Sequence, residues 1–243
     1  MSVSKSSQKL VENRLLAALP RQEYERLLPN LETVSLDFKQ VIYAPSEPIE
    51  HVYFPNNGVV VSLLSIMKGS TAAEVGLVGN EGMAGLPVFL GVDTTPSQAI
   101  VQVPGDSIRM KADVFKALVN RSDTLHGLLM RYTHALMIEI SQSVGCKSHH
   151  SIEQRCCRWL LMNHDRAGSD QFPITQEFLS HMLGVRRAGI TEVAGMLQKA
   201  GLIRYSRGQM TILDRLGLED ACCECYRTVK AEFERLTEVD QIC

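Results

Sequence analysis

The pattern of apolar and polar residues divides the chain into a short helical start, an all-β block and a helical second half. Helical spacing predicts two short helices within residues 8–30, with Pro20 opening the second. From residue 31 to 110, apolar runs alternate with Gly, Pro and Asn turn signals, which is typical of a sandwich, barrel or jelly roll. The runs expected to form strands are Thr33–Leu36, Gln40–Tyr43, His51–Phe54, Gly58–Ile66, Ala73–Val78, Gln98–Val103 and Asp106–Met110.

A long helical pattern follows a short helix at 111–119. It runs from Ser122 to Cys146 and would span about 36 Å. Such a helix is either a core helix or a dimer seam, and its place between two dissimilar domains favours the seam. The predicted seam residues are Leu125, Leu129, Tyr132, Leu136 and Ile140. A second helix (Ile152–His164), a polar connector (Asp165–Pro173) and a final amphipathic helix (Leu218–Leu236) are also expected.

The most specific pattern lies in the C-terminal third. Thr175 is a suitable N-cap for a helix that runs through Met182. Gly184 then supplies the left-handed backbone that a tight turn requires. The next helix begins at Arg186 or Arg187, and its apolar residues at core spacing are Ile190, Val193 and Leu197.

A β-hairpin is expected directly after this helix. Gly201 ends the helix, and short strands flank the turn Ser206–Gly208. Helix, turn, helix and hairpin over residues 174–213 form the layout of a winged helix-turn-helix, whose second helix normally enters the major groove of DNA. The expected DNA-contacting residues are Thr175, Gln176, Arg186, Arg187, Gly189 and Glu192.

These residue types suit the recognition of double-stranded DNA. Arginine can bond to guanine O6 and N7 together, and glutamate can accept a hydrogen bond from cytosine N4. Thr175 and Gln176 stand at a helix N-terminus, which favours a phosphate group. An ordinary helical hairpin with a solvated arginine pair is the alternative, but it does not require the turn glycine and the hairpin.

On these residues the chain resembles the Crp/Fnr family of bacterial transcription regulators. The resemblance rests on Ile174–Glu177, Gly184, Arg187 and Gly201–Ile203. It implies an α+β fold with an N-terminal double-stranded β-helix (jelly-roll-like) of the cyclic-nucleotide-binding type, a long dimerisation helix and a C-terminal winged helix-turn-helix. It also implies that Arg187 reads a base. Ala188 replaces a common glutamate and Glu192 a familiar basic residue, so we expect a different DNA target.

The segment that matches the family's nucleotide-binding cassette departs from it. Leu86 stands where the family has a ribose-binding glutamate, and no arginine lies near Ser97 to pair with a phosphate. A cyclic phosphate buried without that partner would lose a strong charge-assisted interaction, so control by cyclic AMP is not expected. The residues of a possible pocket for another ligand are Gly82, Gly85, Leu86, Ser97 and Gln98.

Composition narrows the classes of protein that fit. The 243 residues carry a net charge of −2, which excludes a generally basic nucleic-acid coat and requires a local DNA-binding patch. No apolar run is long enough to cross a membrane, and the N-terminal residues do not resemble a signal peptide. We therefore expect a cytoplasmic protein with no membrane partner.

The seven cysteines do not predict a disulfide framework or a metal site. The cluster Cys222–Cys225 is tighter than zinc-knuckle spacing, and His149-His150 near Cys146 are more typical of a polar hinge than of a metal or haem site. Iron–sulfur members of the family carry an N-terminal cysteine cluster, which is absent here. Cys156-Cys157 are expected to be buried, and the acidic tail disfavours a reactive thiol. No metal and no cofactor are therefore predicted.

The sequence suggests four segments. They are a sensory β-roll (1–121), a dimerisation helix and hinge (122–148), a DNA-binding domain (149–217) and a C-terminal helix (218–243). The leading hypothesis is a sequence-specific, homodimeric transcription regulator that binds double-stranded DNA, contacts RNA polymerase and senses an unidentified ligand. The alternative is a small-metabolite-binding or thiol-redox sensor module whose helix-turn-helix mainly makes protein contacts. No constellation of residues indicates an enzyme.

Overall fold

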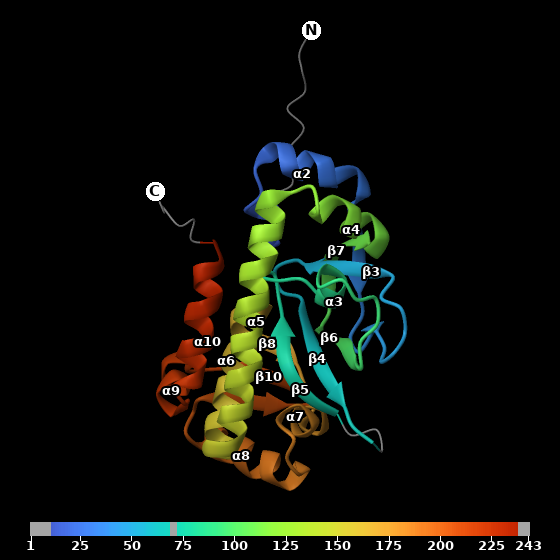
Figure 1. The fold of residues 1–243 in the computed structure, drawn as a ribbon. Helices are drawn as coiled ribbons and strands as arrows, with labels where there is room; N and C mark the ends of the chain where they lie inside the picture. Colours follow the sequence, from blue (N-terminus) through green and yellow to red (C-terminus); the bar gives the residue numbers. More distant parts are fainter. Residues whose placement is uncertain (1–10, 69–71, 238–243) are drawn as a thin grey trace.

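The computed structural model describes residues 11–68 and 72–237. It shows an N-terminal β-roll, a long helix α5 that runs beside it, and a C-terminal domain of helices with a small sheet (Figure 1). The predicted α+β architecture is confirmed. Residues 1–10 and 238–243, which belong to the first and last predicted segments and include Cys243, lie outside the described residues.

The β-roll consists of two antiparallel sheets with strand orders β1-β7-β3 and β2-β6-β4-β5. The expected strands form within two residues of their predicted bounds, because turn residues separate apolar runs that pack into the roll. The strands are β1 (Glu32–Leu36), β2 (Val41–Tyr43), β3 (His51–Pro55), β4 (Val60–Ile66), β5 (Ala72–Val78), β6 (Ser97–Val103) and β7 (Gly105–Lys111).

Short helices flank the roll. They are α1 (Arg14–Ala17), α2 (Arg21–Leu27), the 3-10 helix η1 (Leu28–Asn30), α3 (Leu86–Phe89) and α4 (Ala112–Val119). The predicted helices at the N-terminus and at 111–119 are confirmed. Helix α3 was not predicted, because four residues show no helical period. It begins after Gly85, whose φ of +98° requires glycine and whose backbone lies against Val52.

Helix α5 (Asp123–His149) is the predicted long helix, extended by about one turn. Ser122 caps it, since its hydroxyl oxygen accepts a hydrogen bond from the Leu125 N–H at 3.1 Å. Residues 147–149 contain no helix breaker, so the helix continues past Cys146. Among the described residues, no helix is both long and apolar enough to cross a membrane.

The residues predicted to form a dimer seam face the interior of their own chain. They are Leu125, Leu129, Tyr132, Leu136 and Ile140. The first four are at most 5% exposed and the last is half-buried. The Tyr132 hydroxyl donates to the Met83 carbonyl oxygen at 3.2 Å, and its ring packs 6.3 Å from that of Phe233. Their assignment to a seam is corrected, because apolar spacing identifies the buried face of a helix but not what buries it.

The C-terminal half contains a three-stranded sheet of order β8-β10-β9 and several helices. The elements are α6 (Ile152–Ala167), β8 (Gln171–Pro173), α7 (Gln176–Leu183), α8 (Arg187–Lys199), β9 (Ile203–Ser206), β10 (Gln209–Ile212), α9 (Arg215–Ala221), α10 (Cys225–Glu234) and the 3-10 helix η2 (Arg235–Thr237). Most of the predicted connector 165–173 is therefore regular structure. Helix α6 continues to Gly168, which ends it at a φ of +60°, and β8 pairs with β10.

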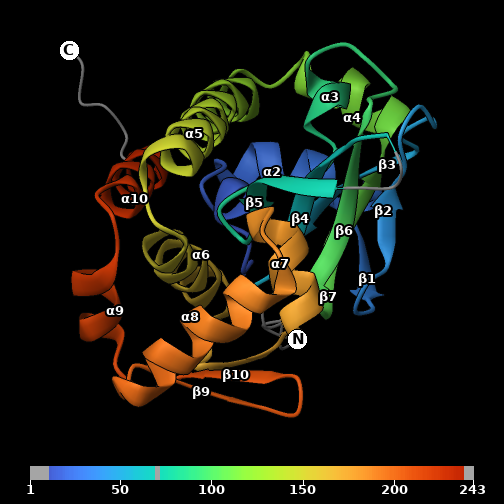
Figure 2. The ribbon, with the colours of Figure 1, turned by 90° about the horizontal axis from the view of Figure 1, so that it is seen from below.

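The single helix predicted from Leu218 to Leu236 is wrong. The chain forms two helices, α9 and α10, with an extended residue, Cys222, after the first (Figure 2). Helix α9 packs against α6, whereas α10 packs against α5. Because α9 and α10 pack mainly against different helices, the chain changes direction between α9 and α10. This break determines where the C-terminal cysteines lie.

A buried charge network joins the β-roll, α5 and α6. The Arg166 guanidinium of α6 donates to Glu81 at 2.7 Å and to Glu139 of α5 at 3.1 Å, and all three side chains are at most 7% exposed. Burial lowers the pKa of Arg166, but the charges of the two glutamates outweigh it and raise that pKa. The Leu77 N–H also donates to Glu139 at 2.8 Å. The C-terminal domain is thus fixed to the β-roll by a paired, hydrogen-bonded charge.

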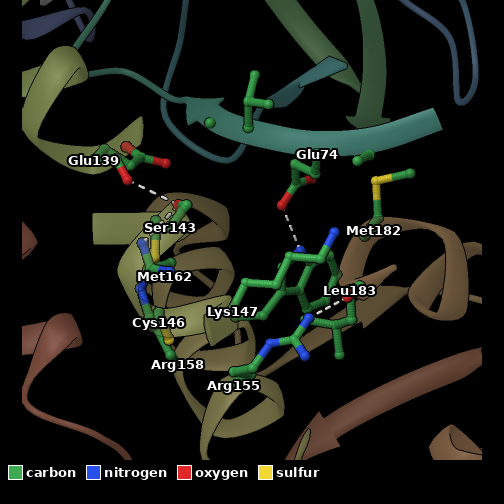
Figure 3. A pocket seen from close by; sticks show the side chains of 14 residues that line it. Glu74, Glu139, Ser143, Cys146, Lys147, Arg155, Arg158, Met162, Met182 and Leu183 are labelled. Carbon is green, nitrogen blue, oxygen red and sulfur yellow. Dashed lines mark hydrogen bonds between the residues drawn. The ribbon is translucent and has the colours of Figure 1, made fainter. Parts of the chain in front are cut away.

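A pocket at the same junction is lined by β5, α5, α6 and α7 (Figure 3). Glu74 of β5 accepts a hydrogen bond from the Trp159 indole N–H at 2.6 Å. The residue keeps some exposed surface, but its second carboxylate oxygen is fully enclosed. Burial, together with the nearby Glu139 charge, raises the pKa of Glu74 to about 8. This carboxyl is therefore mostly protonated at neutral pH.

We expect Glu74→Gln to reduce the pH dependence of stability. The folded protein holds the Glu74 proton up to about pH 8, whereas the unfolded chain releases it near its ordinary value of 4.5. Stability therefore falls as the pH rises through this window, and glutamine, which does not titrate, removes that fall. Melting temperatures of both proteins measured across the window test this. The exposed Glu177→Gln is the control, and an unchanged pH slope in Glu74→Gln would contradict the expectation.

Candidate nucleic-acid interface

Helices α7 and α8 form the helix-turn-helix. The Thr175 hydroxyl accepts a hydrogen bond from the Phe178 N–H at 3.1 Å and so caps α7, as predicted. Gly184 ends α7 with a φ of +62°, and α8 follows with Arg186 as its N-cap. The Arg155 side chain of α6 donates to the Leu183 carbonyl oxygen at the turn. The predicted bounds of both helices are thus confirmed to within a residue.

Helix α8 is amphipathic, as the sequence predicted. Its inner residues are Ile190, Val193, Ala194 and Leu197, each at most 5% exposed. Arg187, Ala188, Thr191 and Glu192 are exposed on the other side. Figure 2 shows α8 at the near end of the molecule, next to the β9–β10 hairpin. This exposed face is the one that can enter a DNA groove.

Gly189 lies on the edge of α8 rather than on its outer face. The residue is half-buried, and a Cβ at this position would lie 3.6 Å from the Ile152 side chain of α6. This is an ordinary van der Waals distance, so the side of α8 that carries Gly189 lies against α6. A contact of Gly189 with DNA stays a prediction. The exposed Thr191, which the sequence did not single out, lies one turn after Arg187.

Thr175 and Gln176 contact their own domain. The Tyr205 hydroxyl of β9 accepts a hydrogen bond from the Gln176 N–H at 3.2 Å, and the Gln176 side-chain oxygen accepts one from Thr191 at 3.1 Å. Both residues are half-buried. The start of α7 is thus linked to the hairpin and to α8, and a phosphate contact at this place stays a prediction.

The β9–β10 hairpin has the geometry of a wing. Arg207 and Gly208 both have positive φ values, +51° and +77°, which is typical of a type I′ turn. The side-chain oxygen of Gln198 in α8 accepts a hydrogen bond from the Tyr205 N–H at 2.9 Å, which ties the hairpin to α8. Arg204 and Arg207 are exposed on it. The sequence did not single out these two arginines, although the place of Arg207 in the hairpin turn indicated exposure.

The exposed cations of this domain form a local basic patch. Its members are Arg186, Arg187, Lys199, Arg204 and Arg207. Arg215 does not add to the patch, because it bonds to Asp165 at 2.6 Å and to Glu219 at 3.0 Å. A patch of this size on a chain with a net charge of −2 fits contact with DNA phosphates near one helix rather than wrapping.

The five residues of the predicted ligand pocket lie in two different settings. Gly82 packs against the Tyr132 ring so closely that a Cβ there would lie 2.4 Å from it. Gly85 and Leu86 begin α3, whereas Ser97 and Gln98 begin β6 and pair with β4. Tyr132, from α5, thus occupies the space beside the glycine turn. A ligand at this place stays a prediction.

The cysteines also fall into two groups. Cys156 and Cys157 are at most 1% exposed in α6, which confirms that they are core residues. Cys146, Cys223 and Cys225 form a separate buried cluster away from the main core. The sequence analysis treated Cys146 and the C-terminal cysteines separately. The break between α9 and α10 that brings them together cannot be predicted from the spacing of apolar residues.

The comparisons with known proteins agree with this geometry. Residues 154–221 match a family model described as a Crp-like helix-turn-helix domain. The fold matches that of FixK2 from Bradyrhizobium japonicum, with a TM-score of 0.67, 14% identity and coverage of 79% of this chain and 98% of that one. It also matches a putative Crp/Fnr-family transcriptional regulator from Eubacterium rectale, with a TM-score of 0.63, 20% identity and coverage of 86% and 97%.

A third solved structure with the same fold is the c-di-GMP-responsive global regulator CLP of Xanthomonas campestris. Its TM-score is 0.60 at 15% identity, with coverage of 79% of this chain and 99% of that one. No curated protein matches the chain. The chain therefore has a Crp-like helix-turn-helix domain, and its overall fold is similar to that of solved Crp/Fnr-family structures.

Proposed function

We propose that the protein is a sequence-specific, dimeric DNA-binding transcription regulator that is not controlled by cyclic AMP. The observation that carries the proposal is the outer face of α8, where Arg187 is exposed beside Thr191 and Glu192 and next to the basic hairpin. Arg187 is placed to read a guanine, and the exposed Glu192 to accept from a cytosine. The same proposal includes a contact with RNA polymerase and a cytoplasmic location for the protein.

A different stripe of α5 supports the dimer. Met130, Met137 and Val144 are 53%, 61% and 65% exposed, and they follow one another at seven-residue spacing. This is the a-position repeat of a coiled-coil seam. Helices α10 and η2 cover the neighbouring stripe, and Arg131 donates to the carbonyl oxygen of Leu236 in η2 at 3.3 Å. The free apolar stripe therefore fits the same stripe of a second copy, which would bring two reading helices into one complex.

Independence from cyclic AMP follows from the residues at the expected nucleotide site. Leu86, which replaces the glutamate of the family cassette, is 9% exposed and offers no hydrogen bond to a ribose. Tyr132 packs against the glycine turn. The domain division of the chain into a β-roll, a connecting helix and a DNA-binding domain is part of this proposal. The signal would act by changing how the two domains are held at the Arg166 junction.

Arg187→Ala is expected to weaken binding to the selected DNA site by about 1–3 kcal/mol and to relax the preference at one base pair of each half-site. Loss of a bidentate base contact removes discrimination, whereas loss of a phosphate contact weakens all sequences alike. Fluorescence anisotropy with the site and its single-base variants measures both effects. Arg235→Ala, an exposed arginine far along the chain, is the control. Equal weakening on every sequence would contradict a base-reading role.

A further inference from the structure

Four side chains with metal-ligand chemistry meet where the long helix ends. Cys146 and His150 lie one turn apart at the C-terminal end of α5, so they share a face. Cys223 and Cys225 come from the break between α9 and α10. One ligand atom of each residue lies within 4.8 Å of those of the other three. Segments more than 70 residues apart in sequence are thus joined at one point.

We propose that Cys146, His150, Cys223 and Cys225 form a mononuclear zinc site. Zinc is bound tetrahedrally, with Zn–S distances of about 2.3 Å and Zn–N distances of about 2.0 Å, which places neighbouring ligand atoms about 3.5–3.8 Å apart. The Cys146 and Cys223 sulfurs are 3.5 Å apart, and the Cys225 sulfur lies 3.6 Å from His150 Nδ1. Two opposite edges of the cluster therefore already match those of a zinc tetrahedron, and the other four ligand–ligand distances are at most 4.8 Å.

The remaining nitrogen of His150 has the partner that a metal-bound histidine requires. His150 Nε2 lies 3.3 Å from the Glu224 carboxylate, between the two C-terminal cysteines. A carboxylate at this place fixes the proton on Nε2 and leaves the Nδ1 lone pair directed at the sulfurs. The chain thus orients the imidazole for coordination through Nδ1.

A positive charge lies beside the sulfurs. Three thiolates, a neutral imidazole and a zinc ion carry a net charge of −1. Arg158 of α6 acts electrostatically on Cys146 and on Cys225, and Figure 3 shows it near Cys146. Its Nη2 donates to Ser143 at 3.0 Å, while its enclosed Nε has no hydrogen-bond partner among the described residues. A buried guanidinium left in this state is stabilised by a neighbouring negative complex.

The geometry favours one zinc ion over the alternatives. A two-iron cluster binds its ligands on two separate metal ions, which needs a wider set than four atoms within 4.8 Å. A disulfide between Cys146 and Cys223 would leave His150 and Cys225 without a role. Four ligands of which the cysteines are at most 4% exposed leave no open position for substrate, so the site is structural. It would fix the end of α5 to the chain beyond the wing.

The test uses the full-length protein purified without added chelator. We expect about one zinc ion per chain by elemental analysis. Replacement by Co²⁺ should give the visible d–d bands of a tetrahedral ion together with near-ultraviolet thiolate-to-metal bands. Cys146→Ser, Cys223→Ser and His150→Ala should each lose most of the bound zinc, whereas the adjacent Cys222→Ser and His149→Ala should keep it. Glu224→Gln should weaken zinc binding by about 10-fold or more, without loss of a ligand.

Two results would overturn the proposal. One is wild-type protein that stays free of zinc after refolding with the ion and gives an octahedral Co²⁺ spectrum. The other is a Cys146–Cys223 disulfide found by mass spectrometry in the freshly purified protein. Since a ligand variant can fail to fold, circular dichroism accompanies each one. Removal of the metal from the wild type by a thiol reagent, with release of about one zinc and a lowered melting temperature, supplies a readout that needs no variant.

Discussion

Met137→Glu is expected to convert the protein into a monomer and to weaken its binding to a two-half-site DNA by about 10²–10⁴-fold. Met137 is 61% exposed in the middle of the free stripe of α5, between Met130 and Val144. Around a two-fold axis the two copies of this residue meet, so the substitution places two carboxylates in an apolar seam. A monomer would then bind each half-site separately, and it would lose the high effective concentration that a dimer gives its second α8 helix at the second half-site.

Light scattering coupled to size-exclusion chromatography measures the mass, and anisotropy measures the affinity. Met67→Glu is the matched control, since Met67 is 55% exposed but follows β4 on the β-roll. Leu136→Ala distinguishes the seam proposed at Met137 from the seam that the sequence predicted, which included Leu136. Leu136 is 5% exposed and therefore packs within its own chain. The substitution should lower stability and leave the dimer intact. A Met137→Glu protein that remains dimeric would show that α5 is not the seam.

Arg166→Met is expected to lower the free energy of unfolding by about 3–5 kcal/mol, because it leaves two buried carboxylates without their cation. Glu81 and Glu139 are 7% and 1% exposed, and Arg166 bonds to both. The guanidinium carbon also lies 5.2 Å from the centre of the Phe233 ring, so packing is lost as well. The β-roll and the DNA-binding domain would separate more readily at this junction.

Urea unfolding followed by tryptophan fluorescence suits this test, since Trp159 lies at the same junction. The control is Arg21→Met, which breaks an exposed pair with Glu25 and is expected to change the free energy of unfolding little, since solvent screens the pair. Adding Glu139→Gln to Arg166→Met should recover part of the lost stability, because it removes one unpaired charge. Equal, small effects of Arg166→Met and Arg21→Met would contradict a buried network that holds the domains together.

The sequence predicted the bounds of most helices and strands well, but it predicted poorly which parts of the protein pack against them. Strands and helices were located because turn residues such as Gly184 and capping residues such as Thr175 and Ser122 act over a few positions. The role of Leu125 and Leu129 was misread, since their spacing is the same whether a second copy or the β-roll covers them. The stripe proposed as the seam contains two methionines and a valine among polar residues, and the pattern alone does not distinguish it from ordinary surface.

Sites that are assembled by tertiary contacts could not be predicted from the pattern of apolar and polar residues. The exposed face of α8 followed from the sequence, although the half-buried position of Gly189 beside Ile152 did not. The group formed by Cys146, His150 and Cys223 did not, because its halves come together only through the bend after α9. Spacing rules for metal sites assume two ligands per short loop, whereas here one pair lies on a helix and the other at a helix break.

Selection of bound sequences from a random DNA duplex library by the full-length protein tests the central claim most directly. The account predicts an enriched palindrome whose half-sites lie about one helical turn, roughly 34 Å, apart, because the proposed dimer would relate two copies of α8 by a two-fold axis along α5. The same selection with Arg187→Ala should lose the preference at one base pair in each half. An enriched motif without two-fold symmetry, or no enrichment at low salt, would contradict it.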